Sequence, residues 1–301
     1  MGERRCSRLR PALAGLLLVL AATGTACQGE APRRTDGVTS GTTSSSAPAT
    51  PARPDVLVIA HRGASAYAPH DTVAAAREAV ERGADVVEAD IRQTADGRPV
   101  ALFHESLAPT TDVEQVFPDR APWRVESFTL AEVRRLDAGS WFGPRFAGER
   151  VPTLDELADA LAGTRVRLNV EVKTPDRYPG LGRRVLAEVR DRPRRFREVE
   201  SFDLGLLSWF AQQSPPVRLG AAAGVPEDRM AEVAPYLDAL NPPLRAIDRA
   251  YVDRAHRLGF EVKVWSVNTP ASVRRAVRLG VDGIYSHRPD LVRDVLAATA
   301  G

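Results

Sequence analysis

The chain has 301 residues, of which 44% are apolar and 27% charged, a composition typical of a globular protein rather than of a disordered or collagen-like chain. Its 41 basic and 39 acidic residues give a formal net charge of +2, which excludes a strongly cationic nucleic-acid binder as the first interpretation. Residues 1–26 hold four arginines and one glutamate, so the remaining 37 basic and 38 acidic residues leave a nearly neutral body. We therefore expect a small or neutral partner, and no protein partner is implied.

The first 26 residues have the pattern of an export signal. Four arginines precede an uncharged stretch from Pro11 to Ala26, whose apolar centre has the length of a signal-peptide core and is too short to span a bilayer with ease. Small residues precede Cys27, as in the lipobox of bacterial lipoproteins, although Gly24 stands where Leu is more usual. We expect cleavage after Ala26 and a lipid on Cys27; cleavage without lipid would leave a free thiol.

Residues 27–54 are predicted to be a disordered tether. Ser, Thr, Gly, Pro and Ala make up 20 of the 27 residues from 28 to 54, and Val38 is the only large aliphatic, so nothing there can offset the entropy of ordering. The only other cysteine, Cys6, lies in the signal, which leaves the mature chain without an intramolecular disulfide. We expect the protein to be lipid-anchored on the outer face of the cytoplasmic membrane, or secreted.

From residue 55 onward, short apolar runs alternate with segments of helical period, a pattern typical of repeated βα units and a parallel sheet. The predicted strands are 56–60, 86–91, 99–104, 166–172, 198–202, 218–223, 238–241, 262–267 and 283–286. The predicted helices are 71–84, 129–137, 153–163, 180–191, 204–213, 230–237, 248–259, 270–280 and 289–298. Several helices begin after Asp, Thr or Pro and end at Gly, as capped helices do.

Nine predicted strands allow the eight strands of a barrel and one extra hairpin strand, and the segment 55–301 has a suitable length for a single domain of this kind. The predicted fold is therefore an α/β protein, a single (β/α)8 TIM barrel with a small insertion at 106–128. A doubly wound open sheet is the alternative, but no predicted strand is followed by a G-x-G-x-x-G turn.

Histidines and charged residues lie at or near the C-terminal ends of several predicted strands, where α/β barrels place their active sites. Within one strand they are two residues apart, so their side chains share a face. The residues concerned are His61 after the first strand, Glu88 and Asp90 on the second, His104 at the end of the third, and Asn169, Glu171 and Lys173 on the fourth.

Carboxylates inside apolar parallel strands point to function, because such strands are covered on both faces and an unpaired buried charge is costly. Taken singly, each residue could equally be a solvated surface group or a satisfied core residue. Three carboxylates without cysteine, namely Glu88, Asp90 and Glu171, favour a hard cation with oxygen ligands over zinc. We expect one divalent cation, with Ca²⁺ ahead of Mg²⁺.

These motifs resemble the glycerophosphodiester phosphodiesterase family over essentially residues 55–301. The runs that carry the resemblance are HRGASAYAP (61–69), DTVAAAREAVERGADVVEADIRQTADGRPVALFHESLAPTTD (71–112), LDAGSWFGPRFAGERVPTLDEL (136–157), NVEVK (169–173) and VWSVNTPASVRRAVRLGVDGIYSHRPD (264–290). A further run, TTDVEQVFPDR (110–120), is similar to periplasmic members of that family, in agreement with the export signal.

The resemblance implies a TIM barrel that hydrolyses glycerophosphodiesters to glycerol 3-phosphate and an alcohol with a bound divalent cation. The roles that it implies are metal ligands for Glu88, Asp90 and Glu171, acid/base catalysis for His61 and His104, phosphate contact for Arg62 and Lys173, and a pocket wall for Trp265. Positive groups of this kind can stabilise the charge that a phosphodiester gains as it is attacked. The nucleophile, either a neighbouring substrate hydroxyl or water, stays open.

Five positions depart from the pattern usual in the family. His70 stands in place of Glu, Asp71 in place of Asn or His, Glu105 in place of Asp, Ser286 in place of Thr, and His287 in place of Asp. We expect these changes to alter specificity or efficiency rather than to abolish activity, because every implied ligand and both implied catalytic histidines remain.

Two other functions stay open. A phospholipase D-like activity on lipids or lysolipids would need an apolar rim at the barrel mouth, which Phe117, Trp123 and Phe128 could supply, although such residues more commonly cover a core. A lipoprotein that binds glycerophosphodiesters or teichoic-acid-like polymers without catalysis would show binding but no turnover in excess Ca²⁺ or Mg²⁺.

Overall fold

The computed structural model describes residues 56–300. Within them the strands are β1 (Leu57–Ala60), β2 (Val86–Gln93), β3 (Pro99–Ala101), β4 (Arg167–Val172), β5 (Phe196–Ser201), β6 (Arg218–Ala221), β7 (Ala239–Leu240), β8 (Glu261–Val264) and β9 (Gly283–Ser286). The signal peptide expected at 1–26, the tether expected at 27–54 and the expected lipid site at Cys27 lie outside the described residues.

All strands except β3 form a closed parallel barrel. β1 pairs with β2 on one side and with β9 on the other, and the ring continues from β2 through β4, β5, β6, β7 and β8 to β9. β3 pairs antiparallel with β2 outside this ring, with Ile91 opposite Ala101. The structure therefore confirms the predicted (β/α)8 barrel and its extra hairpin strand.

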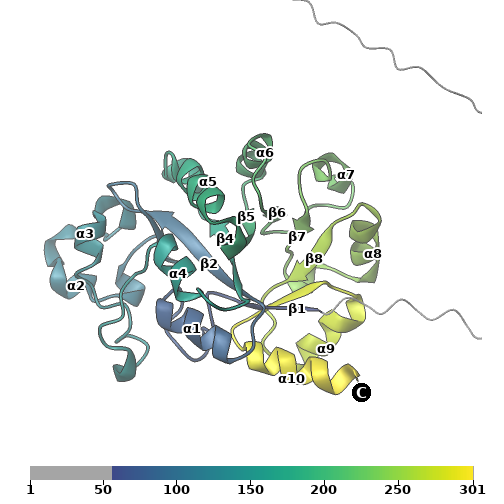
Figure 1. The fold of residues 1–301 in the computed structure, drawn as a ribbon, viewed down its shortest axis with the longest axis horizontal. Helices are drawn as coiled ribbons and strands as arrows, with labels where there is room; N and C mark the ends of the chain where they lie inside the picture. Colours follow the sequence, from purple (N-terminus) through teal and green to yellow (C-terminus); the bar gives the residue numbers. More distant parts are fainter. Residues whose placement is uncertain (1–55, 301) are drawn as a thin grey trace, which may run out of the picture. The chain divides into compact units, whose positions relative to one another are not determined.

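Helices surround the barrel (Figure 1). In the described chain they are α1 (Val73–Glu81), α2 (Val113–Val116), α3 (Leu130–Val133), α4 (Leu154–Ala160), α5 (Leu181–Asp191), α6 (Leu204–Gln212), α7 (Met230–Val233), α8 (Arg249–Arg257), α9 (Pro270–Leu279) and α10 (Pro289–Ala300). All but α2 fall where helices were predicted, although α10 runs two residues further. The four residues of α2 are too few to show a helical period in the sequence.

Side-chain caps explain where several helices begin. The Thr153 hydroxyl accepts a hydrogen bond from the Glu156 amide, and the Glu156 carboxylate accepts one from the Thr153 amide, which makes a capping box at the start of α4. Thr129 and Glu132 form the same arrangement before α3. Each box satisfies two amides that the first turn of the helix leaves without an intrahelical partner.

The apolar core lies mainly between the barrel and the surrounding helices, not inside the barrel. One large cluster of buried residues joins the outward side chains of the strands to the helices. The second cluster, within the barrel, consists of only Ile59, Val86 and Tyr285. The rest of the interior therefore has room for polar side chains, and these reach up to the C-terminal ends of the strands.

A fully buried ion pair between Lys263 and Glu198 fills part of that interior. Two glycines on the strands make the space for it. A Cβ atom at Gly220 would lie 2.2 Å from the Glu198 Oε1 atom, and one at Gly283 would lie 2.7 Å from the Lys263 Cγ atom. Glycine is therefore required at both positions because only a missing side chain leaves room for the long charged ones.

The insertion between β3 and α4 is larger than predicted and contains α2 and α3. Phe128 is buried, the Phe117 ring lies 5.3 Å from it between centroids, and the Trp123 indole donates a hydrogen bond of 2.8 Å to the Phe117 carbonyl. Phe117, Trp123 and Phe128 therefore cover a core, which is the commoner role expected for such residues, and they do not supply the apolar rim that a phospholipase D-like activity would need.

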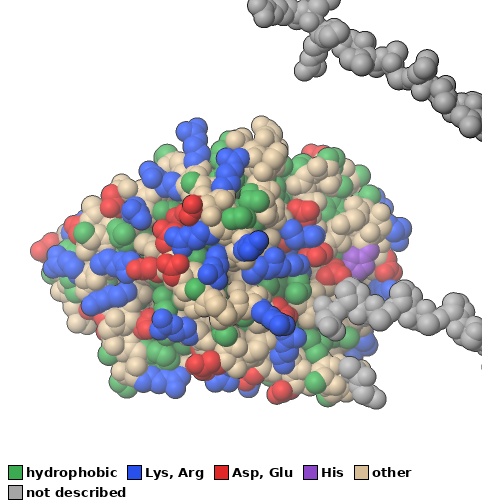
Figure 2. Space-filling view, in the orientation of Figure 1, with side chains coloured by type: hydrophobic (Ala, Val, Ile, Leu, Met, Phe, Trp, Pro, Cys, Tyr) green, Lys and Arg blue, Asp and Glu red, His purple; other side chains and the backbone are tan. Residues whose placement is uncertain are grey.

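The surface carries charges of both signs. Figure 2 shows Lys and Arg side chains distributed among Asp and Glu over the face in view, without a single basic stripe there. Among the described helices, none is long and apolar enough to cross a membrane.

Candidate active site

A cavity of about 250 Å³ opens at the C-terminal ends of the barrel strands. Parallel strands bring these ends to one side of the barrel, so residues far apart in the sequence meet there. Of the predicted site residues, those that line the cavity are His61, Arg62, Glu88, Glu171, Lys173 and Trp265. Asp90 lies against two of these, and His104 packs on Phe103, which lines the same cavity.

Three carboxylates converge beside the cavity. Glu88 and Asp90 project from β2 and Glu171 from β4, and the pairing of these strands sets Asp90 opposite Glu171. One oxygen from each of the three lies within 4.8 Å of the others, and all three side chains are buried. The structure thus brings together the three residues predicted to hold a cation.

Two positively charged side chains, those of Arg62 and Lys173, flank this cluster. The Arg62 Nε atom lies 2.8 Å from Asp90 Oδ2, and the Lys173 Nζ atom lies 2.8 Å from Asp90 Oδ1 and also contacts Glu171. The Arg62 backbone is held at a φ of 59°, and its amide donates a 2.9 Å hydrogen bond to Glu88 Oε2. The Arg62 guanidinium also lies 3.4 Å above the centre of the Phe103 ring, which fixes its plane.

Crowding shifts the proton affinities of the carboxylates. Burial, together with the Asp90 charge, raises the pKa of Glu88 well above its usual range and that of Glu171 to about 7. For Asp90 burial acts in the same direction, but Lys173 and Arg62 outweigh it and lower the pKa. If all three carboxylates were ionised, they would carry more negative charge than Arg62 and Lys173 balance, and Glu88 and Glu171 therefore ionise reluctantly.

The donor set fits a hard divalent cation. Glu88 Oε1 is buried and has no hydrogen-bond partner in the described chain, which is costly for a carboxylate oxygen unless a ligand supplies the missing interaction. Carboxylate oxygens are the ligands that Ca²⁺ and Mg²⁺ prefer. Glu88, Asp90 and Glu171 are therefore the residues that would hold such an ion.

His61 is held in place by its Nδ1 atom. This atom lies 3.1 Å from His287 Nε2 and 3.1 Å from the Ser266 hydroxyl, and the His61 and His287 rings are stacked. Its other nitrogen, Nε2, lies 3.8 Å from Glu88 Oε2, on the side of the carboxylates. Burial and then the Arg62 charge lower the pKa of His61 well below its usual value, so its imidazole is neutral at pH 7.

His104 lies among aromatic rings next to the cavity. Its ring is 4.7 Å from Phe103 and 6.0 Å from His70 between centroids, and His70 also packs on Trp141. Burial and the neighbouring His70 lower the pKa of His104. His70 therefore affects His104 directly, which the sequence could not show.

Asp71 and Glu105, two other positions that depart from the family pattern, lie in different surroundings. Asp71 accepts a 3.1 Å hydrogen bond from the Asp90 amide and lies 3.2 Å from His70 Nδ1, so it supports the strand that carries the carboxylates. Glu105 instead pairs with Arg124 and Arg177 of the surface. The change at Glu105 thus falls outside the cavity.

Trp265 forms a rigid wall of the cavity. Its indole nitrogen donates to the Ala222 carbonyl at 3.1 Å and to the Asn241 carbonyl at 2.6 Å. Phe202 stands 6.4 Å away between ring centroids and is 56% exposed. The cavity therefore has a charged inner side and an aromatic outer side.

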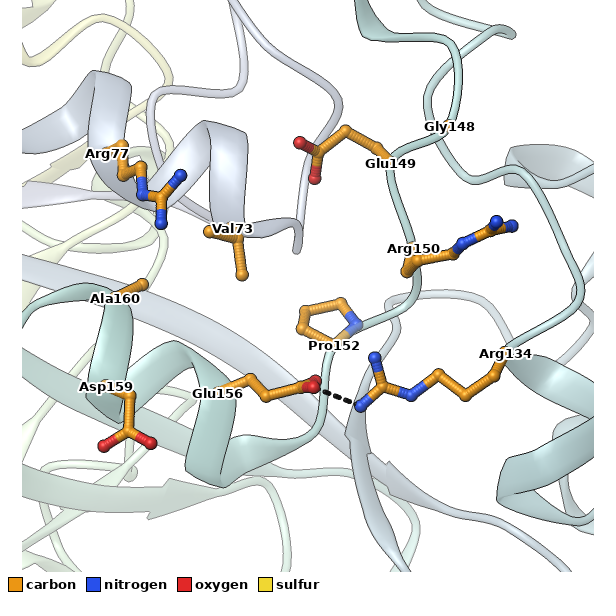
Figure 3. Close-up of a pocket in the computed structure, with 10 residues that line it drawn as sticks. All are labelled: Val73, Arg77, Arg134, Gly148, Glu149, Arg150, Pro152, Glu156, Asp159 and Ala160. Carbon is orange, nitrogen blue, oxygen red and sulfur yellow. Dashed lines mark hydrogen bonds and ion pairs between the residues drawn. The ribbon is translucent and has the colours of Figure 1, made fainter.

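A larger cavity, of about 430 Å³, lies away from these residues, between α1, α4 and the loop at 148–152 (Figure 3). Its arginines and acids are mixed, and Arg134 pairs with Glu156 at one edge of it. No histidine and none of the predicted site residues lines it. Reaction chemistry is therefore assigned to the smaller cavity.

Several residues of the cavity region were not given a role from the sequence, among them Glu200 and His287. Glu200 lines the cavity from β5, and His287 contacts His61. The signal for Glu200 was present, because Glu198 and Glu200 alternate in a short buried strand as Glu88 and Asp90 do. The contact of His287 depends on the closure of β9 against β1, which no local pattern shows.

Comparison with known proteins gives a consistent result. Residues 61–291 match the pattern of the glycerophosphoryl diester phosphodiesterase family. A glycerophosphodiester phosphodiesterase from Caldanaerobacter subterraneus is 32% identical over 240 residues, which cover 78% of this chain and 95% of the relative.

Solved structures agree. A glycerophosphodiester phosphodiesterase from Agrobacterium tumefaciens has 28% identity and a TM-score of 0.65, over 80% of this chain and all of the other. A phosphodiesterase from Oleispira antarctica, solved in complex with its product sn-glycerol-3-phosphate, has 25% identity and a TM-score of 0.71, over 80% of this chain and 96% of the other.

Proposed function

Because the chain belongs to the glycerophosphoryl diester phosphodiesterase family, we propose that it hydrolyses glycerophosphodiesters to glycerol 3-phosphate and an alcohol at the cavity lined by His61. The observation that carries the assignment is the convergence of Glu88, Asp90 and Glu171 within 4.8 Å, flanked by Arg62 and Lys173. A site with three carboxylates and two cations suits an anionic phosphodiester bound together with a divalent cation.

Arg62 and Lys173 supply positive charge that is already in place before reaction. Both side chains are fixed by Asp90, and Arg62 is also held against Phe103, so little reorganisation is needed as charge develops on the phosphate oxygens. When bound by the three carboxylates, a divalent cation would add charge stabilisation at the same oxygens.

His61 and His104 are assigned to proton transfer. Both pKa values lie below the usual value, so either imidazole can accept a proton from the nucleophile at neutral pH. An anionic phosphate next to the other imidazole raises that pKa and favours the protonated form needed to protonate the leaving alkoxide. The nucleophile is water or the neighbouring glycerol hydroxyl, and a transient cyclic phosphate would identify the hydroxyl.

For the cation we propose Ca²⁺ ahead of Mg²⁺, because a crowded set of carboxylates suits the larger ion, which accepts more oxygen ligands and a less regular geometry. For location we propose export and a lipid on Cys27, which the small residues before this cysteine support. The proposed metal preference is tested by removing metal from the enzyme with a chelator, adding back Ca²⁺ or Mg²⁺ in steps, and measuring turnover at each step.

A coupled assay for released glycerol 3-phosphate tests the activity. The purified protein should release it from several glycerophosphodiesters, chelator should stop the release, and added Ca²⁺ or Mg²⁺ should restore it. Binding of the diesters without release in excess metal would instead favour the capture lipoprotein.

One observation favours a second substrate class, lysolipids cleaved in the manner of a phospholipase D. Phe202 lies on the cavity wall and is 56% exposed, and Trp141, which packs on His70, is 42% exposed. Exposed rings beside a charged cavity could contact an acyl chain. A kcat/KM for lysophosphatidylcholine above that for glycerophosphocholine, reduced by Phe202→Ser, would support this class.

A further inference from the structure

Glu200 is a buried carboxylate of the cavity that the mechanism above does not use. It projects from β5, is 2% exposed, and lines the cavity together with Glu171 and Trp265. Its Cα atom pairs with that of Glu171 on the neighbouring strand, which places it next to the proposed cation ligands. It is not one of the carboxylates that converge as a candidate metal cluster among the described residues.

One oxygen of Glu200 is fully used by the barrel interior. Glu200 Oε2 accepts a hydrogen bond of 2.8 Å from the Tyr285 hydroxyl and another from the Asn241 side-chain amide. Asn241 also donates to Glu198, whose charge is balanced by Lys263. The carboxylate is therefore fixed in position by two donors, and the nearest buried lysine is already engaged elsewhere.

The other oxygen lacks a partner. Glu200 Oε1 is buried and makes no hydrogen bond with any described residue. Buried carboxylate oxygens normally have a hydrogen-bond partner, because an oxygen that loses its bonds to water and gains none in the protein costs much of its desolvation free energy. Since Oε2 is occupied and the residue lines the cavity, the missing partner must come from whatever fills the cavity.

A hydroxyl group fits this position better than a phosphate or an ammonium group. Glu200 lies beside Glu171 and close to Glu198, so its free oxygen faces a region that already holds other carboxylates. A hydroxyl is neutral and can donate to this oxygen, whereas an anionic phosphodiester oxygen can only accept and would be repelled. An ammonium would need to be desolvated among groups that Arg62 and Lys173 already balance in part.

We propose that Glu200 is a specificity-determining residue that binds a hydroxyl of the glycerol part of the substrate. This inference rests on the proposed function, since it assumes that the phosphate lies at Arg62 and Lys173 and that a polyol arm reaches the cavity floor. Glu200 would then distinguish a glycerol arm from an alkyl arm of the same length.

The experiment compares two ligands that differ only in hydroxyl groups. Binding of sn-glycerol 3-phosphate and of n-propyl phosphate is measured by calorimetry in excess Ca²⁺, and again in excess Mg²⁺. Glu200→Ala is the test variant, and it should fold because Asn241 keeps its bond to Glu198 and Tyr285 keeps its contact with Asn169. Glu188→Ala on α5 is the control, a partly buried glutamate with a pKa of about 7 that does not line the cavity.

Wild-type protein and Glu188→Ala should both bind sn-glycerol 3-phosphate more tightly than propyl phosphate. In Glu200→Ala the affinity for sn-glycerol 3-phosphate should fall roughly ten- to hundredfold, the range for a hydrogen bond to a carboxylate, while the affinity for propyl phosphate stays unchanged. Binding of 2-hydroxypropyl and 3-hydroxypropyl phosphate to the wild type then shows which hydroxyl is bound.

Equal weakening of both ligands would overturn the proposal and indicate that Glu200 acts on the phosphate or the cation. Absence of any preference for sn-glycerol 3-phosphate in the wild type would overturn it without need of the variant. Failure of the proposed function gives a different result, namely a wild-type protein that releases no glycerol 3-phosphate from any diester.

Discussion

Glu171→Gln is the sharpest test of the carboxylate cluster. The substitution keeps the size of the side chain and removes one negative charge within 4.8 Å of the oxygens of Glu88 and Asp90. A cation held among these oxygens would lie no farther than this from the Glu171 charge, and even at 4.8 Å, with an effective dielectric constant of ~20, a unit charge pair is worth about 3.5 kcal/mol. Because the pKa of Glu171 is about 7, ionising this side chain at pH 7 takes only a small part of that free energy.

A loss of that size corresponds to two orders of magnitude or more in apparent metal affinity, and we expect about a 10²-fold loss because the amide oxygen can still act as a weak ligand. The assay is release of glycerol 3-phosphate across a metal titration, with metal binding measured separately by calorimetry. Activity should fall steeply at low metal and return in part at high metal. Glu188→Gln, the same change on α5, should leave both curves unchanged. Wild-type metal affinity and turnover in Glu171→Gln would refute the assignment of the cluster.

Four further predictions use other features. His104→Ala should lower turnover by about 10²- to 10⁴-fold with little effect on metal affinity, and near-normal turnover would remove His104 from the mechanism. His70→Glu should keep the fold and change apparent metal or substrate affinity; activation of an inert protein would instead favour the capture lipoprotein. The Asp137 carboxylate accepts hydrogen bonds from the amides of Gly139, Ser140 and Gly148 and so holds the 139–148 loop. Burial raises the pKa of Asp137, but these hydrogen bonds outweigh burial and lower the pKa to about 2. Asp137→Asn should therefore lower the free energy of unfolding by about 1–2 kcal/mol above pH 4, and in denaturant titrations this difference should vanish as the pH falls through about 2, since a lowered carboxyl pKa stabilises only the ionised form. Cys27→Ser should move the protein from the membrane fraction to the soluble fraction with activity retained, and unchanged fractionation would contradict lipidation.

The sequence predicted the barrel well because each β-strand is a short apolar run set between capped helices. Glu88, Asp90 and Glu171 were visible for the same reason, since acids inside apolar strands are exceptional. The ends of the strands were predicted less accurately. The strand predicted at 99–104 stops at Ala101, so His104 lies beyond β3 rather than at its end.

What could not be predicted depends on contacts between distant strands. His287 meets His61 only because β9 closes the barrel against β1. The proposed role of Glu200 depends on one donor from β9 and one from Asn241, directly after β7. The rings of the insertion were expected to cover a core more than to form a rim, but the sequence could not decide between the two. Phe117 and Phe128 look alike as candidates for a rim or a core until their packing against each other is known.

The glycines beside the buried ion pair limit how this barrel can change in evolution or by design. Gly220 accommodates Glu198, and Gly283 accommodates Lys263, so none of the four can be replaced independently without a clash or an unpaired charge. Transplanting one strand from a relative would mismatch this set even where the backbones superimpose. A chimaera of this enzyme should therefore exchange β5, β6, β8 and β9 together.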